Sequence, residues 1–253
     1  MLESTIFYGL IIAGFLLAAA TFVSLFFIVA PYGRHTRGGW GPTIPSRLGW
    51  IVMETPAPLV FALCFALGRQ PAAATAWAFL AMWQAHYLHR AFIYPWQRRG
   101  GQRRMPLAVV AMGMAFNAGN AYVNGRYLFT FSGGYPQEWL LDVRFLIGLV
   151  LFGGGFALNR WADHTLRNLR RPGEEGYRIP HGGMYRWVSC PNYLGEVLEW
   201  TGWAVATWSL PGLAFAVWTA ANLLPRAWAH HRWYRQTFPD YPPERRAVIP
   251  GLW

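Results

Sequence analysis

The sequence lacks lysine altogether, and charged residues of either sign are scarce, at 13% of its 253 residues. A soluble domain carries roughly a quarter charged residues. This shortage, together with 54% hydrophobic residues, excludes an ordinary soluble domain and indicates a membrane protein. Cysteine is also scarce. Cys64 and Cys190 lie in or near apolar segments, which excludes a disulfide framework.

Several common catalytic and binding motifs are missing. There is no GxGxxG after a strand and no P-loop, so a nucleotide is not held by a Rossmann domain. No order of serine, histidine and acid indicates a nucleophilic triad. His86, His89, His230 and His231 resemble fragments of the histidine boxes of membrane di-iron oxygenases, which need about eight histidines. The chain has seven, so we expect no metal site.

Long apolar runs account for most of the chain. A spanning helix needs roughly 20 mostly apolar residues, and the sequence predicts seven such helices, at about residues 6–30, 48–68, 73–94, 106–129, 143–161, 191–209 and 211–228. The first run is too long for a signal-peptide core and has no basic region before it. We therefore expect an all-α integral membrane protein whose seven transmembrane helices form a single domain over residues 1–253.

Arginine placement predicts the orientation of this bundle. All arginines except Arg69, Arg126 and Arg144 fall in the loops after the first, third and fifth spans or in the C-terminal tail. By the positive-inside rule, the N-terminus is outside and the C-terminus is cytosolic. The net charge of +11 then faces anionic headgroups. We expect a lipid bilayer, in the endoplasmic reticulum or a bacterial cytoplasmic membrane, but no nucleic acid, and we predict no protein partner.

The stretch 170–200 is polar, aromatic and rich in glycine, and it leads directly into an apolar segment. Asn192, Tyr193, Glu196 and Glu199 share a helix face by their spacing, and the nearby pair of Asn159 and Asp163 does so too. Ionisable residues within a membrane segment are candidates for function. They predict a polar cavity open to the cytosol, although an interfacial loop with capping residues is the alternative. Asn117 and Asn124 are equally consistent with hydrogen bonds between helices.

These residues supply an anion site and an acid. Arg170, Arg171, Arg178 and the tail arginines are suited to phosphates, and tyrosines such as Tyr177 and Tyr234 are suited to stacking on bases. Deeper in the bundle, Glu54 and Tyr87 are candidates to polarise a carbonyl group. A dinucleotide at the cytosolic mouth and an apolar carbonyl compound in the bundle would together form a hydride-transfer site.

Four segments carry a resemblance to a known family. They are RRPGEEGYRIPHGGMYRWVSCPNYLGEVLEW from residue 170, HYLHRAFIY from residue 86, AVATWSLPGLAFA from residue 204 and the ending HHRWYRQTFPDYPPERRAVIPGLW. With the Asn159–Asp163 pair, they closely resemble the steroid 5α-reductase family, the 3-oxo-5α-steroid 4-dehydrogenases. The similarity runs from about residue 32 to the C-terminus. It implies a seven-helix membrane enzyme that uses NADPH to reduce the 4,5 double bond of an apolar 3-oxo-Δ4-steroid.

The resemblance also implies roles for individual residues. Tyr87 hydrogen-bonds the 3-oxo group and helps to protonate it, and Glu54 shares that carbonyl. The positions matching the family's NADPH site are Asn159, Asp163, Arg170, Tyr177, Asn192, Arg226, His230 and Tyr234, with Tyr193 and Glu196 at the nicotinamide end. One departure concerns substrate preference, because Met53 stands where the family's Gln-Glu-x-Pro pattern has glutamine.

Two other classes remain as alternatives. Sterol C14-reductases and isoprenylcysteine methyltransferases also have a cytosolic cofactor pocket over their C-terminal helices, and a methyltransferase would bind S-adenosylmethionine. A lipid- or sterol-binding membrane protein without catalytic activity is the third possibility. It has no need of Glu54 and Tyr87 beside an anion pocket, so the sequence favours the reductase.

Overall fold

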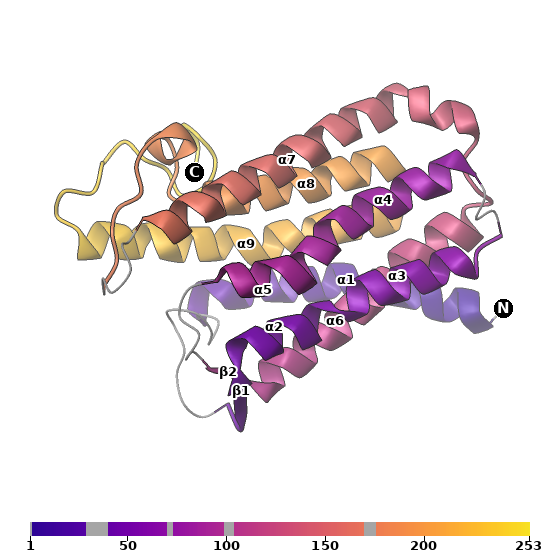
Figure 1. Ribbon diagram of the computed structural model, residues 1–253, viewed down its shortest axis with the longest axis horizontal. Coiled ribbons are helices and arrows are strands. Elements are labelled where there is room, and N and C mark those ends of the chain that lie inside the picture. Colours follow the sequence, from indigo (N-terminus) through magenta and orange to yellow (C-terminus); the bar gives the residue numbers. More distant parts are fainter. Residues whose placement is uncertain (1, 29–39, 70–72, 99–103, 170–175) are drawn as a thin grey trace. The chain divides into compact units, whose positions relative to one another are not determined.

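The computed structural model describes residues 2–28, 40–69, 73–98, 104–169 and 176–253, and these residues are mostly helical (Figure 1). The α-helices are α1 (Leu2–Phe27), α2 (Ser46–Glu54), α3 (Pro56–Ala66), α4 (Ala74–Leu88), α5 (Tyr94–Gln97), α6 (Leu107–Arg126), α7 (Val143–Asn168), α8 (Pro191–Thr207) and α9 (Leu210–Thr237). Two π-helical segments follow α4 and α6, η2 (His89–Ile93) and η3 (Tyr127–Phe131), and two 3₁₀ turns are η4 (Gln137–Leu141) and η5 (Gly183–Arg186). Strands β1 (Thr43–Pro45) and β2 (Arg104–Pro106) form an antiparallel pair.

Helices occupy all seven segments that the sequence predicts as spans. Three stretches are long and apolar enough to cross a membrane, namely Leu2–Phe27, Ser46–Ala66 and Val143–Asn168. The class of helical membrane protein is therefore supported, while the full set of seven spans and the orientation of the termini stay predictions. Helices α7 and α9 continue beyond residues 161 and 228, where the predicted spans end. A helix does not stop where its residues become polar.

The described chain divides into two compact units. Unit 1 comprises residues 1–12, 30–146 and 209–211, and unit 2 comprises residues 13–29, 147–208 and 212–253. In unit 1, α6 runs beside α2 and α3 in the same direction. Gly113 of α6 lies directly against the side chain of Met53, and Gly125 lies against Cys64 about three turns further along. Glycine allows this approach because a Cβ atom at either position would collide with its neighbour.

Ion pairs fix one end of unit 1. Arg126, at the C-terminus of α6, donates from Nε to Glu3 at 2.9 Å and also bonds Thr130. Asp142 accepts from the guanidinium of Arg144 at 2.8 Å through each of its two oxygens, and from the Arg144 backbone N–H at the start of α7. This hydrogen bonding holds the pKa of Asp142 down at about 2.

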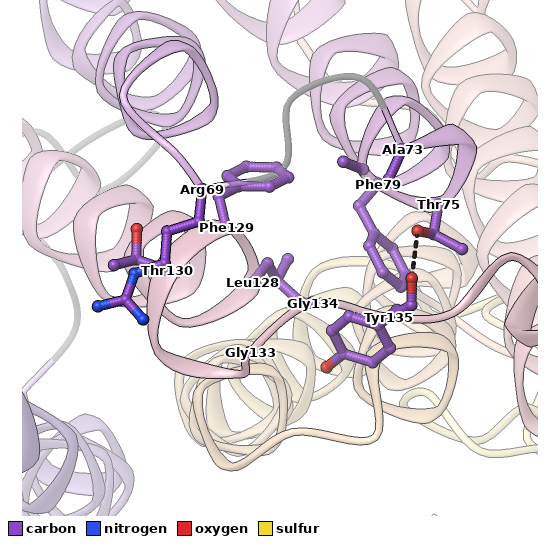
Figure 2. Close-up of a pocket in the computed structure, with 11 residues that line it drawn as sticks. Arg69, Ala73, Thr75, Phe79, Leu128, Phe129, Thr130, Gly133, Gly134 and Tyr135 are labelled. Atoms are coloured by element: carbon purple, nitrogen blue, oxygen red, sulfur yellow. Dashed lines mark hydrogen bonds between the residues drawn. The ribbon is translucent and has the colours of Figure 1, made fainter.

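A small pocket, partly open to solvent, lies at the same end (Figure 2). It is bordered by the first turns of α4 and by η3, and Thr75 closes one side by donating to the carbonyl of Tyr135 at 2.9 Å. Thr75 precedes Tyr87 on α4 by about 18 Å at 1.5 Å per residue. The pocket is therefore separate from the predicted carbonyl site.

Unit 2 is organised by a close antiparallel pair, α7 and α8 (Figure 1). Along the seam, Gly148 meets Ala206, Phe152 meets Gly202, Gly155 meets Glu199, and Asn159 meets Gly195, in each case through backbone atoms. At each level one of the two partners is a glycine, which lets the two backbones touch, as in tightly packed membrane helices.

The C-terminal tail returns to the start of α8. Val188 forms an isolated parallel bridge with Arg246. The backbone N–H groups of Ser189 and Cys190 donate to the carbonyls of Arg246 and Ala247 at 2.9 and 3.1 Å. The tail is thus part of the folded unit that carries the predicted cofactor residues.

Candidate functional site

The buried carboxyl group of Glu54 lies where α2 meets α3. Pro56 starts α3 and has no N–H to donate to the carbonyl four residues earlier, so the helix is interrupted here. Glu54 is 6% exposed. Its Oε2 accepts a hydrogen bond of 3.1 Å from Asn117, and its Oε1 lies 3.4 Å from Nε of Arg90. The sequence predicted Glu54 but neither of these partners.

Side chains from neighbouring helices hold the backbone around this break. Asn117 donates to the carbonyl of Met53 at 2.8 Å, Trp83 to that of Ala57 at 3.1 Å, and Gln84 to that of Pro58 at 2.9 Å. Each of these buried donors thus bonds a backbone carbonyl within four residues of Glu54. The backbone at this point is therefore fixed from both α4 and α6.

Tyr87 lies one helical turn after Trp83 on α4 and is 3% exposed. The two rings are 4.9 Å apart, and Trp83 stacks in turn on Phe61 of α3 at 4.4 Å and 6°. The π-helical segment η2 begins two residues after Tyr87 and carries Arg90, the partner of Glu54. Such irregular turns are frequent at functional sites. Unit 1 thus holds both predicted carbonyl-polarising residues on packed, buried helices.

The predicted polar cluster of unit 2 forms at the end of the α7–α8 seam. Asn159 donates to the backbone carbonyl of Asn192 at 2.9 Å and lies 3.4 Å from a carboxyl oxygen of Glu196. Asn192 donates to Asp163 at 3.2 Å. The structure therefore brings together all four of these residues. Their contacts depend on the seam, since Gly195 lies against the backbone of Asn159.

A second group connects α8 to α9. The hydroxyl of Tyr193 lies 3.2 Å from Nε2 of His230 and accepts from Arg226 at 3.3 Å. Arg226 also donates to Asn222 at 3.3 Å, and its guanidinium lies over the Tyr193 ring. Arg226 and His230 are four residues apart and share one face of α9. A cation, an imidazole and a phenol thus meet on the α8 side of this helix.

The remaining predicted cofactor residues are placed differently. Tyr177 is 39% exposed and packs edge-on against Trp233. Tyr234 is buried, and its ring stacks on Tyr241 at 5.2 Å, so this ring face packs within the protein. Arg170 lies outside the described residues.

Arg245 is a residue that the sequence did not single out. It is 2% exposed, and its Nη2 lies 3.3 Å from Nδ1 of His181. Within the described part of the chain, its Nε and Nη1 are buried without a hydrogen-bond partner. Buried guanidinium donors that lack an acceptor are costly. They fit an anionic group such as a cofactor phosphate, and only the general count of tail arginines pointed to them.

Ser189 joins α8, α9 and the tail in a buried hydrogen-bond cluster. Its Oγ lies 2.6 Å from Nδ1 of His231, 2.6 Å from the hydroxyl of Tyr241 and 3.1 Å from the carbonyl of Arg246. Burial, followed by the charges of Arg235 and Arg246, lowers the pKa of His231. Ser189 is itself 4% exposed, so we interpret the cluster as a structural clasp and not as a nucleophile.

This clasp predicts a pH dependence of stability. Because the folded pKa of His231 is lowered, the unfolded chain binds the proton more readily as the pH falls below the ordinary value of about 6.5. The stabilisation is thus complete above that pH and is lost as the pH falls from it through the folded pKa. Thermal unfolding in detergent between about pH 5 and pH 8 should show this loss, and His231→Gln should flatten it. If stability depends on pH in the same way in His231→Gln as in the parent, other groups cause the loss of stability.

No group of three or more histidine, cysteine or acidic side chains in the described ranges is arranged to hold a metal ion. Both cysteines are buried free thiols.

Long apolar helices, a buried carboxyl group and a buried tyrosine in unit 1, and a polar cluster on α7 and α8 define a helical membrane protein with polar groups in its interior. The profile of the family described as 3-oxo-5-alpha-steroid 4-dehydrogenase matches residues 103–253. The chain is 40% identical to steroid 5-alpha-reductase DET2 of Gossypium hirsutum, with 99% of each chain covered. It is 41% identical to 3-oxo-5-alpha-steroid 4-dehydrogenase 1 of Bos taurus, over 93% of each chain. The human protein of that name is 42% identical over 87% of this chain and 85% of its own length.

The chain therefore belongs to the 3-oxo-5-alpha-steroid 4-dehydrogenase family. The names of these relatives identify it as an oxidoreductase of steroid metabolism, and its apolar helices are consistent with a membrane location. The resemblance predicted from sequence is confirmed.

Proposed function

We propose that this protein reduces the 4,5 double bond of 3-oxo-Δ4-steroids to the 5α-3-oxo product, with NADPH as the reductant. The observation that carries the proposal is that Glu54 and Tyr87 are both buried within unit 1 in a chain of this family. Trp83 packs on Tyr87 and donates to Ala57, three residues after Glu54.

In the proposed reaction, Tyr87 donates its hydroxyl proton toward the 3-oxo oxygen, and Glu54 shares that oxygen. Hydride addition at C5 moves electrons through the conjugated enone onto the oxygen, so negative charge develops there. Donors fixed in advance stabilise that charge more than they stabilise the neutral ketone, which lowers the barrier. An ionised carboxylate only accepts hydrogen bonds, so this role requires Glu54 to be protonated beside the Arg90 guanidinium, which lies 3.4 Å from its Oε1. The enol that forms then takes a proton from water at C4 and returns the oxygen proton to Tyr87, which gives the 5α-3-oxo product.

The cofactor belongs to unit 2 in this proposal. NADPH would supply the hydride when bound. Asn159, Asp163 and Asn192 offer amide and carboxyl groups to its polar parts, and Arg226 offers a cation. The orphaned donors of Arg245 support a phosphate-bearing ligand. The further positions that we assign to this pocket are Arg170, Tyr177, Tyr193, Glu196, His230 and Tyr234.

We further propose that the enzyme has seven spans with the cofactor residues on the cytosolic side. Within unit 1, Arg104 precedes α6 and Arg126 ends it, so these two arginines lie at opposite ends of one helix. Only the Arg126 end is paired with an acid, Glu3, among the contacts described above. In this proposal, the membrane is the endoplasmic reticulum membrane or a bacterial cytoplasmic membrane.

The test is an assay of the purified protein in detergent with progesterone or testosterone. We expect a 5α-reduced product with NADPH and a lower catalytic efficiency with NADH, because arginines pair with the additional 2′-phosphate. Tryptophan fluorescence should report binding of NADPH and not of S-adenosylmethionine. Equal efficiency with both reductants would refute the cofactor preference. A lack of 5α product, with binding of S-adenosylmethionine, would favour the methyltransferase alternative.

A further inference from the structure

We propose that Asn117 is a positioning residue for Glu54, which selects the carboxyl oxygen that serves the substrate carbonyl. This inference rests on the proposed steroid reduction. It concerns a residue for which hydrogen bonding between helices was the simplest interpretation from sequence alone.

The geometry around Asn117 links the backbone and the carboxyl group of the same segment. Its Nδ2 donates to the carbonyl of Met53 at 2.8 Å and to Oε2 of Glu54 at 3.1 Å. Asn117 is 6% exposed and Glu54 is 6% exposed, so little water competes for these bonds. One amide group therefore fixes both the end of α2 and the rotation of the Glu54 carboxyl group.

The direction of this hydrogen bond distinguishes the two oxygens. Oε2 accepts from the amide, so Oε1 is the carboxyl oxygen that is left to face a substrate carbonyl. Oε1 is the oxygen that lies 3.4 Å from Nε of Arg90. The Arg90 guanidinium also lies over the rings of Trp50 and Tyr94, at 4.7 and 5.0 Å. These rings hold the cation beside Oε1, while Asn117 keeps Oε2 turned toward α6 and away from the proposed substrate carbonyl.

Close packing one helical turn away keeps Asn117 within reach. The side chain of Met53 lies on Gly113, four residues before Asn117 on α6, where a Cβ atom would collide with it. The approach of α2 to α6 is thus set by this methionine and glycine together. Met53 occupies the position at which the chain departs from the family pattern, and its backbone carbonyl is the second acceptor of the Asn117 amide.

A mutant cycle tests this role. Asn117→Leu keeps a similar volume and removes the donor, and loss of a buried hydrogen bond predicts a fall in kcat of roughly 5- to 150-fold. The KM for NADPH should stay unchanged. In a Glu54→Ala background, Asn117→Leu should have almost no further effect on kcat, because its target is already gone. Product formation is measured by mass spectrometry, so that low residual rates are counted.

Asn124→Leu is the matched control. Asn124 is a buried amide two turns along the same helix, and its Nδ2 bonds Asn120 within α6. We expect this variant to keep the parent kcat.

Equal losses from Asn117→Leu with and without Glu54 would show a purely structural role and overturn the inference while steroid reduction stands. If the parent protein does not reduce a 3-oxo-Δ4-steroid, the proposed function and this role both fail. Thermal unfolding and NADPH titration confirm that each variant is folded.

Discussion

Tyr87→Phe should lower the turnover of steroid reduction by roughly 10²–10³-fold while leaving the protein folded, since removal of one oxyanion-type donor typically has this effect. The substitution keeps the ring, which lies 4.9 Å from Trp83, and removes only the hydroxyl group. Packing is therefore retained, and the loss reports the chemistry at the carbonyl oxygen. The rate is measured as kcat with saturating NADPH and steroid in detergent.

The surroundings of Tyr87 explain why the effect should be large. Trp83 is fixed by its hydrogen bond to Ala57 and by stacking on Phe61, so the tyrosine ring has a rigid neighbour. A donor held in place before reaction needs no reorganisation when charge develops. The site is also buried, and hydrogen bonds to charge are stronger where water is excluded.

Three comparisons make the result specific. Affinity for NADPH should be nearly unchanged in Tyr87→Phe, whereas Asn192→Ala should weaken it by about 5- to 150-fold through loss of buried polar contacts. Glu54→Gln should be milder than Glu54→Ala because it keeps a donor. The Tyr87→Phe, Glu54→Ala double variant should lose less than the product of the single losses, since both act on one oxygen. Near-normal turnover in Tyr87→Phe would remove this tyrosine from the mechanism.

The sequence predicted those features that depend on local spacing. Apolar runs located the helices, because a buried or lipid-facing helix needs an unbroken apolar stretch. A spacing of four placed Asn159 and Asp163 on one face, and Asn192 of α8 does bond both of them in the polar cluster. Motif resemblance identified the family, which the comparisons confirm.

Contacts between distant segments were not predictable in this way. The pairing of Glu54 with Arg90 and Asn117 joins three helical segments, and no local pattern specifies their register. Among the described residues, Nε and Nη1 of Arg245 have no hydrogen-bond partner because the tail is buried. The polar sequence of the tail gives no sign of this burial. The π-helical turn at η2 was also not predictable, because His89–Ile93 contains neither proline nor glycine.

One missed feature did have a sequence signal. Gly148 and Gly155 are seven residues apart on α7, and Gly195 and Gly202 are seven apart on α8. A seven-residue repeat of glycine in apolar helices is typical of closely packed membrane helices. Read together, the two repeats predict the antiparallel seam that the structure contains.

The seam leads to the last prediction, which compares neighbouring glycines of one helix. A Cβ atom at Gly155 would lie 2.5 Å from the carbonyl oxygen of Gly195 and against the backbone nitrogen of Glu199. A Cβ atom at Gly154 would meet nothing within 4 Å. Both substitutions by alanine gain the same helix propensity, about 1 kcal/mol. Their difference therefore isolates the collision.

Gly155→Ala should be less stable than Gly154→Ala by at least about 1–3 kcal/mol, the usual cost of overpacking, because a backbone cannot move aside as a flexible side chain can. Separation of α7 from α8 should also lengthen the contacts of Asn159 with Asn192 and Glu196. We therefore expect Gly155→Ala to bind NADPH more weakly, whereas Gly154→Ala should match or exceed the parent in thermal unfolding and bind NADPH normally. Equal stability and equal NADPH affinity in the two variants would mean that backbone contact along this seam does not hold the cofactor residues in place.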